Sequence, residues 1–343
     1  MKSFEWTSPQ TLARALETRT ATTAAAMLSA DGRPPSGKVI LKSGGIDLLG
    51  LMKDDLLTPA RVVNLRTIPE LAGIVERSDG TLRIGANATL AQIARDQVVL
   101  ARYRALADAT AHSASPQLRQ VATIGGNLLQ RPRCWYFRSS HHHCARKGGE
   151  TCFAFAGENQ YHAIFGQDGC AIVHPSTPAT ALVALGAKLE LARTGGARRV
   201  VDVEAFFVPA AKDIRRENDL RDGEIITAVV LPATGPRTRS VHLRQGELDS
   251  FDWPIADVAV VLDLEANGAC RSAAIIFGAA APVPYRAREA EAILKGARIS
   301  EDSARRAAKA ALTGAAPLAK NAYKVPIFEA LTRRAIMEAG SLT

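Results

Sequence analysis

The sequence predicts an α+β protein with two or three domains. Its 343 residues exceed the length of one ordinary domain, and 47% of them are hydrophobic, which is enough to bury a sizeable core. Strand-like and helical patterns both occur along the chain, and the composition changes at the Ala-Thr-Gly-Pro segment of residues 233–236. Residues 54–59 have the composition of a linker, and Pro59 disfavours helix just before it. We therefore expect three parts, 1–58, 59–233 and 234–343.

The expected elements of the first two parts are short and are separated by turn residues. Ser78-Asp79-Gly80 is typical of a hairpin turn, and Gly195-Gly196 lies between two alternating segments that predict a second hairpin. The predicted helices are 11–18, 23–28, 90–96, 103–110 and 181–187. The predicted strands are 37–41, 61–65, 73–76, 82–85, 188–192, 198–201 and 224–231.

The third part combines a strand pair with helices. Alternating apolar residues predict paired strands over 258–264 and 272–278. Helical patterns follow over 287–294, 301–312 and 327–338.

Four of the five cysteines lie within 37 residues, and this clustering indicates one site. The four are Cys134, Cys144, Cys152 and Cys170, whereas Cys270 stands alone and is expected to be a core thiol. Disulfides belong to small secreted domains that lack a sufficient core, which this chain does not resemble. Structural zinc sites usually contain tight Cys-x2–4-Cys pairs, but the gaps here are nine, seven and seventeen residues. A [4Fe–4S] cluster accepts ligands from separate segments, so it is favoured over zinc and over unligated thiols, with all three left open.

Basic and imidazole side chains surround these cysteines in sequence. The basic residues would stabilise an anionic metal–thiolate centre, although a solvated basic loop is the alternative. They are Arg131, Arg133, Arg138, Arg146 and Lys147. The run His141-His142-His143 is expected to be exposed and to bind nothing.

Two segments with paired glycines precede the cysteines. In each, at residues 40–47 and 121–127, we expect an apolar strand to run into a Gly-Gly turn. Glycine allows positive φ and close approach of the backbone, so successive N–H groups can surround a phosphate. Neither segment has the Gly-x-Gly-x-x-Gly or the Gly-Lys-Ser/Thr pattern. Two such turns therefore predict a split pyrophosphate site outside a Rossmann fold.

These motifs give the chain a specific resemblance. Lys42-Ser43-Gly44-Gly45-Ile46-Asp47-Leu48 and Ala122-Thr123-Ile124-Gly125-Gly126-Asn127 resemble the two FAD loops of the flavin subunit of molybdenum hydroxylases, the family of xanthine dehydrogenase, carbon monoxide dehydrogenase and aldehyde oxidoreductases. Residues 278–287 resemble the signature of the C-terminal domain in that family. The resemblance implies a two-part FAD-binding domain of the PCMH, or vanillyl-alcohol-oxidase-like, type, followed by an α+β domain with a small antiparallel sheet and helices.

The resemblance also implies which residues contact the FAD. Two departures weaken the transfer: Thr177 stands where relatives often have an acidic residue, so it could serve as a helix N-cap instead, and Leu220 could serve the core. The implied FAD-binding residues are Leu41, Lys42, Ser43, Gly44, Gly45, Ile46, Asp47, Ser115, Thr123, Gly125, Gly126, Asn127, Thr177 and Leu220.

The cysteine region narrows the resemblance to a subset of the family. Residues 130–137, 147–152 and 157–162 resemble an insertion found in periplasmic aldehyde oxidoreductases, whose flavin subunit binds an extra [4Fe–4S] cluster. A related insertion occurs in 4-hydroxybenzoyl-CoA reductases. The resemblance implies that the insertion spans about 128–172 and that Cys134, Cys144, Cys152 and Cys170 are the cluster ligands.

The function implied is that of an electron-exit subunit. A large partner would hold the molybdenum cofactor and act on an aldehyde, and a small partner with two [2Fe–2S] clusters would pass electrons to FAD and on to an external acceptor. None of this chain's side chains is expected to act as a catalytic acid or base. The rivals are a subunit of a 4-hydroxybenzoyl-CoA reductase or xanthine dehydrogenase type and, more remotely, a binding protein held together by zinc.

Charge and the N-terminus bear on partners and location. The net charge of +9 suggests an acidic partner or a general surface property; aromatic residues make up only 5% and no recognition motif is present, so nucleic acid is not expected. No stretch predicts a membrane span, and the N-terminus has no export signal. On its own the chain would be cytoplasmic, whereas the resemblance implies periplasmic residence by co-export with a signal-bearing partner.

Overall fold

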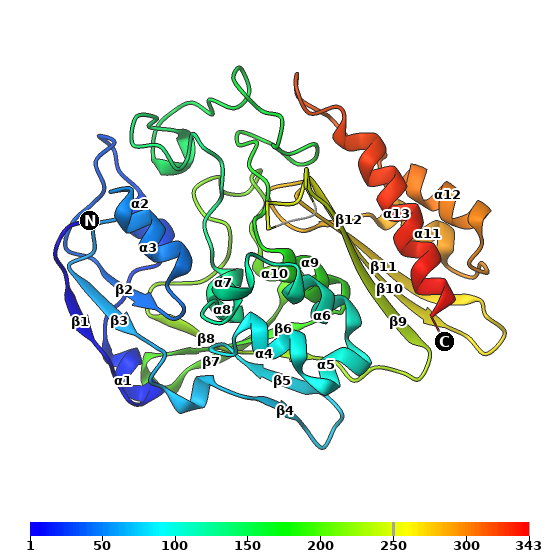
Figure 1. Cartoon of the computed structure of the whole chain (residues 1–343). Coiled ribbons are helices and arrows are strands. Elements are labelled where there is room, and N and C mark those ends of the chain that lie inside the picture. Colours follow the sequence, from blue (N-terminus) through cyan, green and yellow to red (C-terminus); the bar gives the residue numbers. More distant parts are fainter. Residues whose placement is uncertain (249–250, 343) are drawn as a thin grey trace.

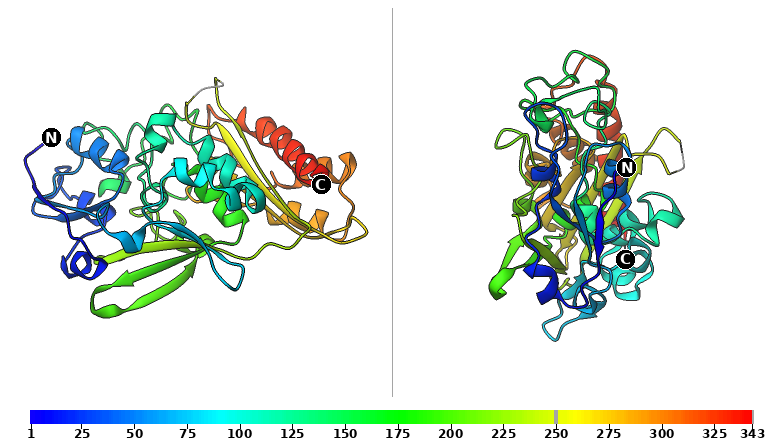
Figure 2. Two further views of the ribbon diagram at one scale, coloured as in Figure 1. Left: turned by 60° about the horizontal axis from the view of Figure 1, so that its bottom comes forward. Right: turned by 90° about the vertical axis from the view of Figure 1, so that its left-hand side faces the viewer.

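Three β-sheets, each accompanied by helices, follow one another along the chain (Figure 1). The computed structural model describes residues 1–248 and 251–342. The first and third sheets lie toward opposite ends of the molecule, and so do the two termini (Figure 2). No described helix has both the length and the apolar composition needed to cross a membrane.

The first sheet is small and parallel. Its order is β1-β3-β2, formed by β1 (Glu5–Thr7), β3 (Arg61–Asn64) and β2 (Val39–Lys42). Its helices are α1 (Leu12–Glu17), α2 (Thr23–Met27) and α3 (Ile46–Lys53). Apolar residues of α2 and α3 pack against Ile40 and Val62 of the strands. Because β3 pairs with both other strands, it belongs to this sheet although it follows residue 58; the expected domain boundaries stay a prediction.

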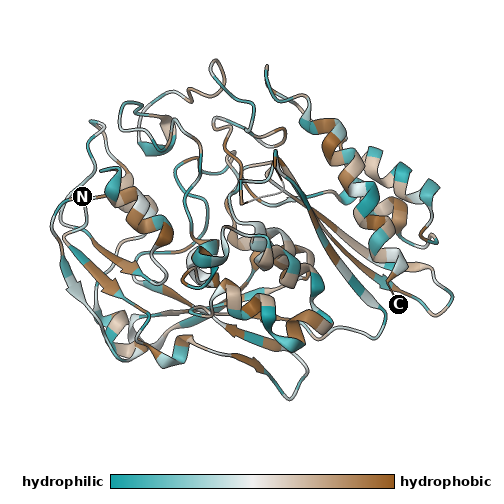
Figure 3. Cartoon of the chain, viewed as in Figure 1, coloured by the Kyte–Doolittle hydropathy of each residue, from teal (hydrophilic) through white to brown (hydrophobic). Residues whose placement is uncertain are grey.

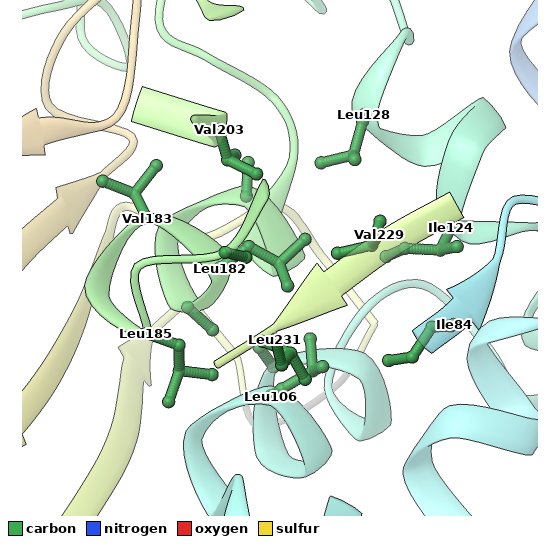
Figure 4. Packing of buried hydrophobic residues seen from close by; sticks show 14 of the residues in the cluster. Ile84, Leu106, Ile124, Leu128, Leu182, Val183, Leu185, Val203, Val229 and Leu231 are labelled. Carbon is green, nitrogen blue, oxygen red and sulfur yellow. The ribbon is translucent and has the colours of Figure 1, made fainter. Parts of the chain in front are cut away.

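The second sheet is antiparallel throughout and has the order β4-β5-β8-β6-β7. The strands are β4 (Ile74–Glu76), β5 (Leu82–Gly85), β6 (Lys188–Arg193), β7 (Arg198–Asp202) and β8 (Glu224–Leu231). The neighbouring helices are α4 (Leu90–Arg95), α5 (Gln97–Arg102), α6 (Arg104–Ala111), α7 (Pro116–Arg119), α8 (Ile124–Leu128), α9 (Thr177–Ala184) and α10 (Val203–Phe206). Figure 4 shows their core, in which Leu106, Leu182 and Leu231 are fully buried.

The third sheet is antiparallel with the order β12-β11-β10-β9. Its strands are β9 (Thr238–Gln245), β10 (Ala256–Leu264), β11 (Cys270–Gly278) and β12 (Tyr285–Arg286), and its helices are α11 (Arg288–Leu294), α12 (Glu301–Ala310) and α13 (Lys324–Ser341). Figure 3 shows hydrophobic and hydrophilic residues alternating in these helices, as expected for helices that cover a sheet on one side. Cys270 is fully buried in this core, as predicted for a core thiol.

Residues 130–175 form a long excursion from the second part. Its only helical element is the 3-10 turn η2 (Ala145–Lys147). It lies as loops between the N-terminal helices and α13 (Figure 1). Backbone hydrogen bonds connect it to the first and third parts of the chain. The Ser29 N–H donates to the Lys147 carbonyl, and the Ile164 N–H donates to the Ala280 carbonyl. We refer to residues 130–175, which lie close to the expected bounds of about 128–172, as the insertion.

The predicted elements agree with the structure to within a few residues, and the antiparallel C-terminal sheet is confirmed. Eight helices and strands of the described residues were not predicted: β1, α3, α5, α7, α8, α10, β9 and β12. One prediction was wrong: residues 121–123 are not a strand, because Thr123 caps the short helix α8, which contains Gly125 and Gly126. Cap chemistry therefore outweighed the apolar character of Val121 and Ala122.

Candidate functional site

A cavity of about 440 Å3 lies between the first and second parts and is bordered by the loop before β10. All fourteen residues expected to contact FAD line this one cavity. They come from the β2–α3 turn, the start of α7, α8, the start of α9 and the segment before β8. The structure thus brings together residues as far apart in sequence as Leu41 and Leu220.

The β2–α3 turn presents the start of a helix to the cavity. Gly45 is the N-cap of α3 with φ +84°, a conformation that favours glycine, and it provides no side-chain acceptor for the first turn. The first N–H groups of a helix have no partner inside the helix, so here they are available to an anion. Gly44 packs tightly, because a Cβ there would lie 2.5 Å from the Val121 carbonyl oxygen. The first turn therefore has the features of a phosphate site.

The second glycine pair is built differently. The N–H groups of residues 124–127 are all hydrogen-bonded within the chain: Ile124 to Ala88, Gly125 to Ala86, and Gly126 and Asn127 to Thr123. The two glycines allow close packing instead, since a Cβ on Gly126 would lie 3.0 Å from Thr123 Oγ1. The expectation that both pairs form equivalent turns with open N–H groups was therefore wrong.

Side-chain hydrogen bonds join the two loops. Ser43 Oγ donates to Asn87 Oδ1 at 2.6 Å and lies 2.9 Å from Thr123 Oγ1. Asn87 in turn donates to the Leu65 carbonyl, which fixes it against the end of β3. On the α8 side, Ser176 Oγ donates to Asn127 Oδ1 at 2.5 Å. These bonds hold polar side chains from four segments around one end of the cavity.

The remaining expected contacts line the walls. Ser115 is the N-cap of α7, and its hydroxyl accepts from the Leu118 N–H. Thr177 is the first residue of α9 and not its cap; Ser176 fills that role by accepting from the Ala179 N–H. Leu220 is half-buried, lines the cavity and also packs on the main core, so both of its expected roles are met by one position.

Two charged residues lie at the cavity in different states. The pKa of Lys42 is lowered by burial and by the nearby Arg66, and its ammonium lies 5.3 Å from the centre of the Trp6 ring. Asp47 has both carboxylate oxygens engaged: Oδ2 accepts from the Arg131 N–H at 2.9 Å, and Oδ1 pairs with Arg138 at 2.6 Å and Arg133 at 3.0 Å. Lys42 thus lines the cavity with its ammonium beside Trp6, whereas Asp47 is directed to the insertion.

The four clustered cysteines also meet. Cys134, Cys144, Cys152 and Cys170 all line one small cavity of about 10 Å3, which is room for about one water molecule. Within residues 1–248 and 251–342, no group of three or more His, Cys, Asp or Glu side chains is placed to hold a single metal ion. The structure therefore gathers the four thiols, but does not present a finished coordination geometry for one ion.

Three of the clustered thiols have strongly shifted pKa values, raised for Cys134 and Cys152 and lowered for Cys170; that of Cys152 is raised first by its hydrogen bond with Cys170 and then by burial. The pKa of Cys170 is lowered by a hydrogen bond from Cys152 and by the adjacent Arg146, whose Nε lies 3.4 Å from Cys170 Sγ. Burial raises the pKa of Cys134 to about 11. His162 Nε2 lies 3.2 Å from Cys134 Sγ, and burial lowers the pKa of this histidine to about 4.

Buried ion pairs surround the cysteines. Glu217, Arg131 and Arg146 are at most 2% exposed, and the carboxylate pairs with both guanidinium groups at 3.0 and 2.6 Å. Together with Arg133, Arg138 and the buried Lys147, five cations face only two carboxylates, Asp47 and Glu217. Of these five cations, Arg131, Arg146 and Lys147 are buried, whereas Arg133 and Arg138 bind Asp47.

The His141-His142-His143 run is only partly as expected. His141 is exposed, but His142 and His143 are half-buried. His142 contacts the rings of Tyr136 and Phe153, and the His143 ring lies 3.0 Å from the Ser29 carbonyl oxygen. The two histidines therefore pack within the insertion and against the first part.

Several important residues carried no recognisable sequence signal. Glu217 lies in the charged run 212–219, which reads as solvated, yet it is the buried counterion of two insertion arginines. Asn87 and Ser176 align the cavity loops, but isolated polar residues of this kind are common in turns. Only the capping pattern around Ser176 could have been read from the sequence.

Comparison with known proteins agrees with this geometry. Residues 2–234 match the family described as the FAD binding domain in molybdopterin dehydrogenase. Residues 242–339 match the family described as the CO dehydrogenase flavoprotein C-terminal domain. The two matches together cover nearly the whole chain.

Individual relatives and solved structures are similar to the chain over most of their length. The chain is 33% identical to the aldehyde oxidoreductase FAD-binding subunit PaoB of Escherichia coli over 324 residues, 94% of this chain and 96% of the relative. It is 26% identical over 311 residues, 89% of each chain, to the xanthine dehydrogenase FAD-binding subunit of Escherichia coli O157:H7. Its fold matches a chain of CO dehydrogenase from Oligotropha carboxidovorans with a TM-score of 0.75 at 22% identity, covering 100% of this chain and 99% of that chain.

Proposed function

The chain belongs to the family of FAD-binding subunits of molybdenum-containing dehydrogenases, and from this we propose that it carries electrons out of an aldehyde oxidoreductase through FAD and a [4Fe–4S] cluster. The observation that carries the proposal is the pairing of two sites in one chain: a large cavity lined by both glycine segments, and four cysteines around a second, small cavity beside it. FAD would act as a carrier that accepts and releases electrons singly or in pairs.

The large cavity fits FAD by its lining. The open first turn of α3 suits the pyrophosphate, with Lys42 as a nearby cation. Ser43, Thr123 and Asn127 would offer polar side chains, and the glycines of α8 would let the cofactor approach closely. Apolar residues such as Leu41 and Leu220 would line the wall. In this proposal Asp47 lines the cavity but does not bind the phosphate, because its carboxylate is bound to the insertion.

The cysteine site fits a metal–thiolate cluster by donor type and charge. Buried charge without compensation is costly, and the three buried cations Arg131, Arg146 and Lys147 have one buried carboxylate, Glu217, among them, which favours a further anion at the cysteines. A thiolate-bound cluster supplies that anion, because metal ligation requires deprotonated cysteines. The pKa of Cys170 is lowered first by the hydrogen bond from Cys152 and further by Arg146, which favours the thiolate. Since the space now holds about one water, the four thiols must spread apart to take four irons.

The remaining parts of the proposal rest on relatives. Aldehyde chemistry is favoured over xanthine chemistry by the identity of 33% to PaoB, against 26% to the xanthine dehydrogenase subunit. A large molybdenum subunit and a small subunit with two [2Fe–2S] clusters would complete the enzyme, and an external acceptor would take electrons from FAD. Export with a signal-bearing partner would place the complex in the periplasm.

Anaerobic reduction of the purified complex tests this function. Addition of an aldehyde should bleach the flavin absorbance and should reduce an external dye acceptor. In the complex with Gly126→Val, the partner's [2Fe–2S] clusters should still be reduced, while dye reduction should be lost. Undiminished dye reduction by a flavin-free complex would contradict electron exit through this chain.

A further inference from the structure

We propose that Asp47 is a positioning residue that makes occupancy of the flavin cavity and of the cysteine site favour each other. The proposal rests on the proposed function, in which FAD and a cluster occupy these two sites. It changes the role of Asp47 from a residue of the flavin loop to the connection between that loop and the insertion. The contacts of its carboxylate carry the argument.

On one side, Asp47 belongs to the flavin cavity. It is the second residue of α3 and follows the Gly44-Gly45 turn, and all of these residues line the cavity. The following residues Leu48, Leu51 and Met52 anchor α3 in the core of the first part. Any force on the Asp47 carboxylate therefore acts on the first turn of α3, where the N–H groups are open to a phosphate.

On the other side, the Asp47 carboxylate binds the segment that contains Cys134. The Arg131 N–H, the Arg133 guanidinium and the Arg138 guanidinium all bind it, at 2.9, 3.0 and 2.6 Å. Arg138 also donates to the carbonyls of Arg131 and Pro132 at 2.9 and 2.7 Å. The Arg138 side chain thus closes the segment 131–138 into a loop. Asp47 binds three donors of this loop, and Cys134 is next in sequence to one of them, Arg133.

These contacts would couple the two sites in both directions, from the cysteine site to the flavin cavity and the reverse. The Asp47 side chain is 15% exposed, so its bonds to the arginines are poorly screened by water. Any shift of the segment 131–138 on occupation of the cysteine site would be transmitted through the Asp47 bonds to the first turn of α3. If one occupancy favours the other, linkage requires the reverse effect to have the same size. Couplings of this kind typically change affinity by about 5- to 150-fold.

A double-mutant cycle tests the connection in the purified, deflavinated complex. The four proteins are the wild type, Cys152→Ser, Asp47→Asn and the double variant, and the readout is the Kd of FAD by titration, together with iron content. We expect the loss of the cluster in Cys152→Ser to weaken FAD binding about tenfold in the Asp47 background. In the Asp47→Asn background the same loss should change the Kd less than about twofold.

Controls separate this effect from general damage. Asp302→Asn removes an exposed carboxylate that also pairs with two arginines, Arg305 and Arg306, and it should leave the tenfold effect intact. Arg138→Gln removes the partner of Asp47 on the insertion side, and it should abolish the tenfold effect on FAD affinity as Asp47→Asn does.

Each outcome decides a separate point. Equal FAD affinities of the wild type and Cys152→Ser overturn the coupling. A tenfold effect that persists in Asp47→Asn and in Arg138→Gln overturns the role of Asp47. Absence of flavin or of cluster iron from the wild type contradicts the proposed function and, with it, the coupling that rests on it.

Discussion

Replacement of Glu217 by glutamine should loosen the insertion strongly. The variant leaves two guanidinium groups, Arg131 and Arg146, at 1–2% exposure without their carboxylate. Removal of one partner from a buried ion pair typically costs about 3–5 kcal/mol, and because glutamine keeps one acceptor oxygen we expect about 3 kcal/mol. We expect this loss in the free energy of local opening of the insertion, because the insertion has its own backbone hydrogen bonds.

Hydrogen exchange of the insertion amides measures this loss. The N–H groups of Lys147 and Cys170 are bonded to the carbonyls of Cys144 and Gln167, so their exchange requires local opening. A loss of about 3 kcal/mol should accelerate it about 150-fold. The matched control is Glu301→Gln, which removes an exposed pair with Arg333 and should cost less than about 0.5 kcal/mol. Acceleration of less than about fivefold in Glu217→Gln would refute the view that its carboxylate compensates two buried charges.

Three further predictions concern the two sites and pH. Gly126→Val should lose FAD and retain most iron, because apolar bulk there would block close approach of the pyrophosphate to the backbone, and a Cβ would lie tightly at 3.0 Å from Thr123 Oγ1; stoichiometric extracted flavin would contradict this. Cys152→Ser should lose the [4Fe–4S] signal in low-temperature magnetic resonance, and unchanged iron and sulfide would remove Cys152 from the ligand set. Burial lowers the pKa of His174 to about 3, so the unfolded chain binds the proton first and stability should fall by about 2 kcal/mol between pH 6.5 and 4.5. In His174→Asn the denaturant midpoint should change less with pH, and an equal slope in both proteins would exclude this histidine as the cause.

The sequence predicted much of the fold because most of its elements carry local signals. Strand β8 was predicted with its observed bounds, since seven apolar or β-branched residues follow Glu224 and end at Pro232. The two expected sites also follow from local patterns of glycine and cysteine, which the structure places at two separate cavities. Helix α3 was missed because its N-cap is Gly45, which has no side-chain acceptor and so lacks the usual sequence signal of a helix start.

The rest depends on contacts between distant segments. Nothing near Asp47 in sequence indicates that three arginines more than eighty residues later will bind it. The same holds for Glu217, which meets Arg131 from 86 positions away and Arg146 from 71. Long side chains with formal charge are usually solvated, so a burial of 2% is visible only once the fold is known.

Cofactor analysis of the anaerobically purified complex decides whether this chain is a flavin and iron–sulfur subunit. We expect FAD in a one-to-one ratio to the chain, and four iron and four sulfide beyond those of the partner's two [2Fe–2S] clusters. Zinc in place of this extra iron, with no flavin, would contradict the account and would leave a protein whose insertion is held together by zinc.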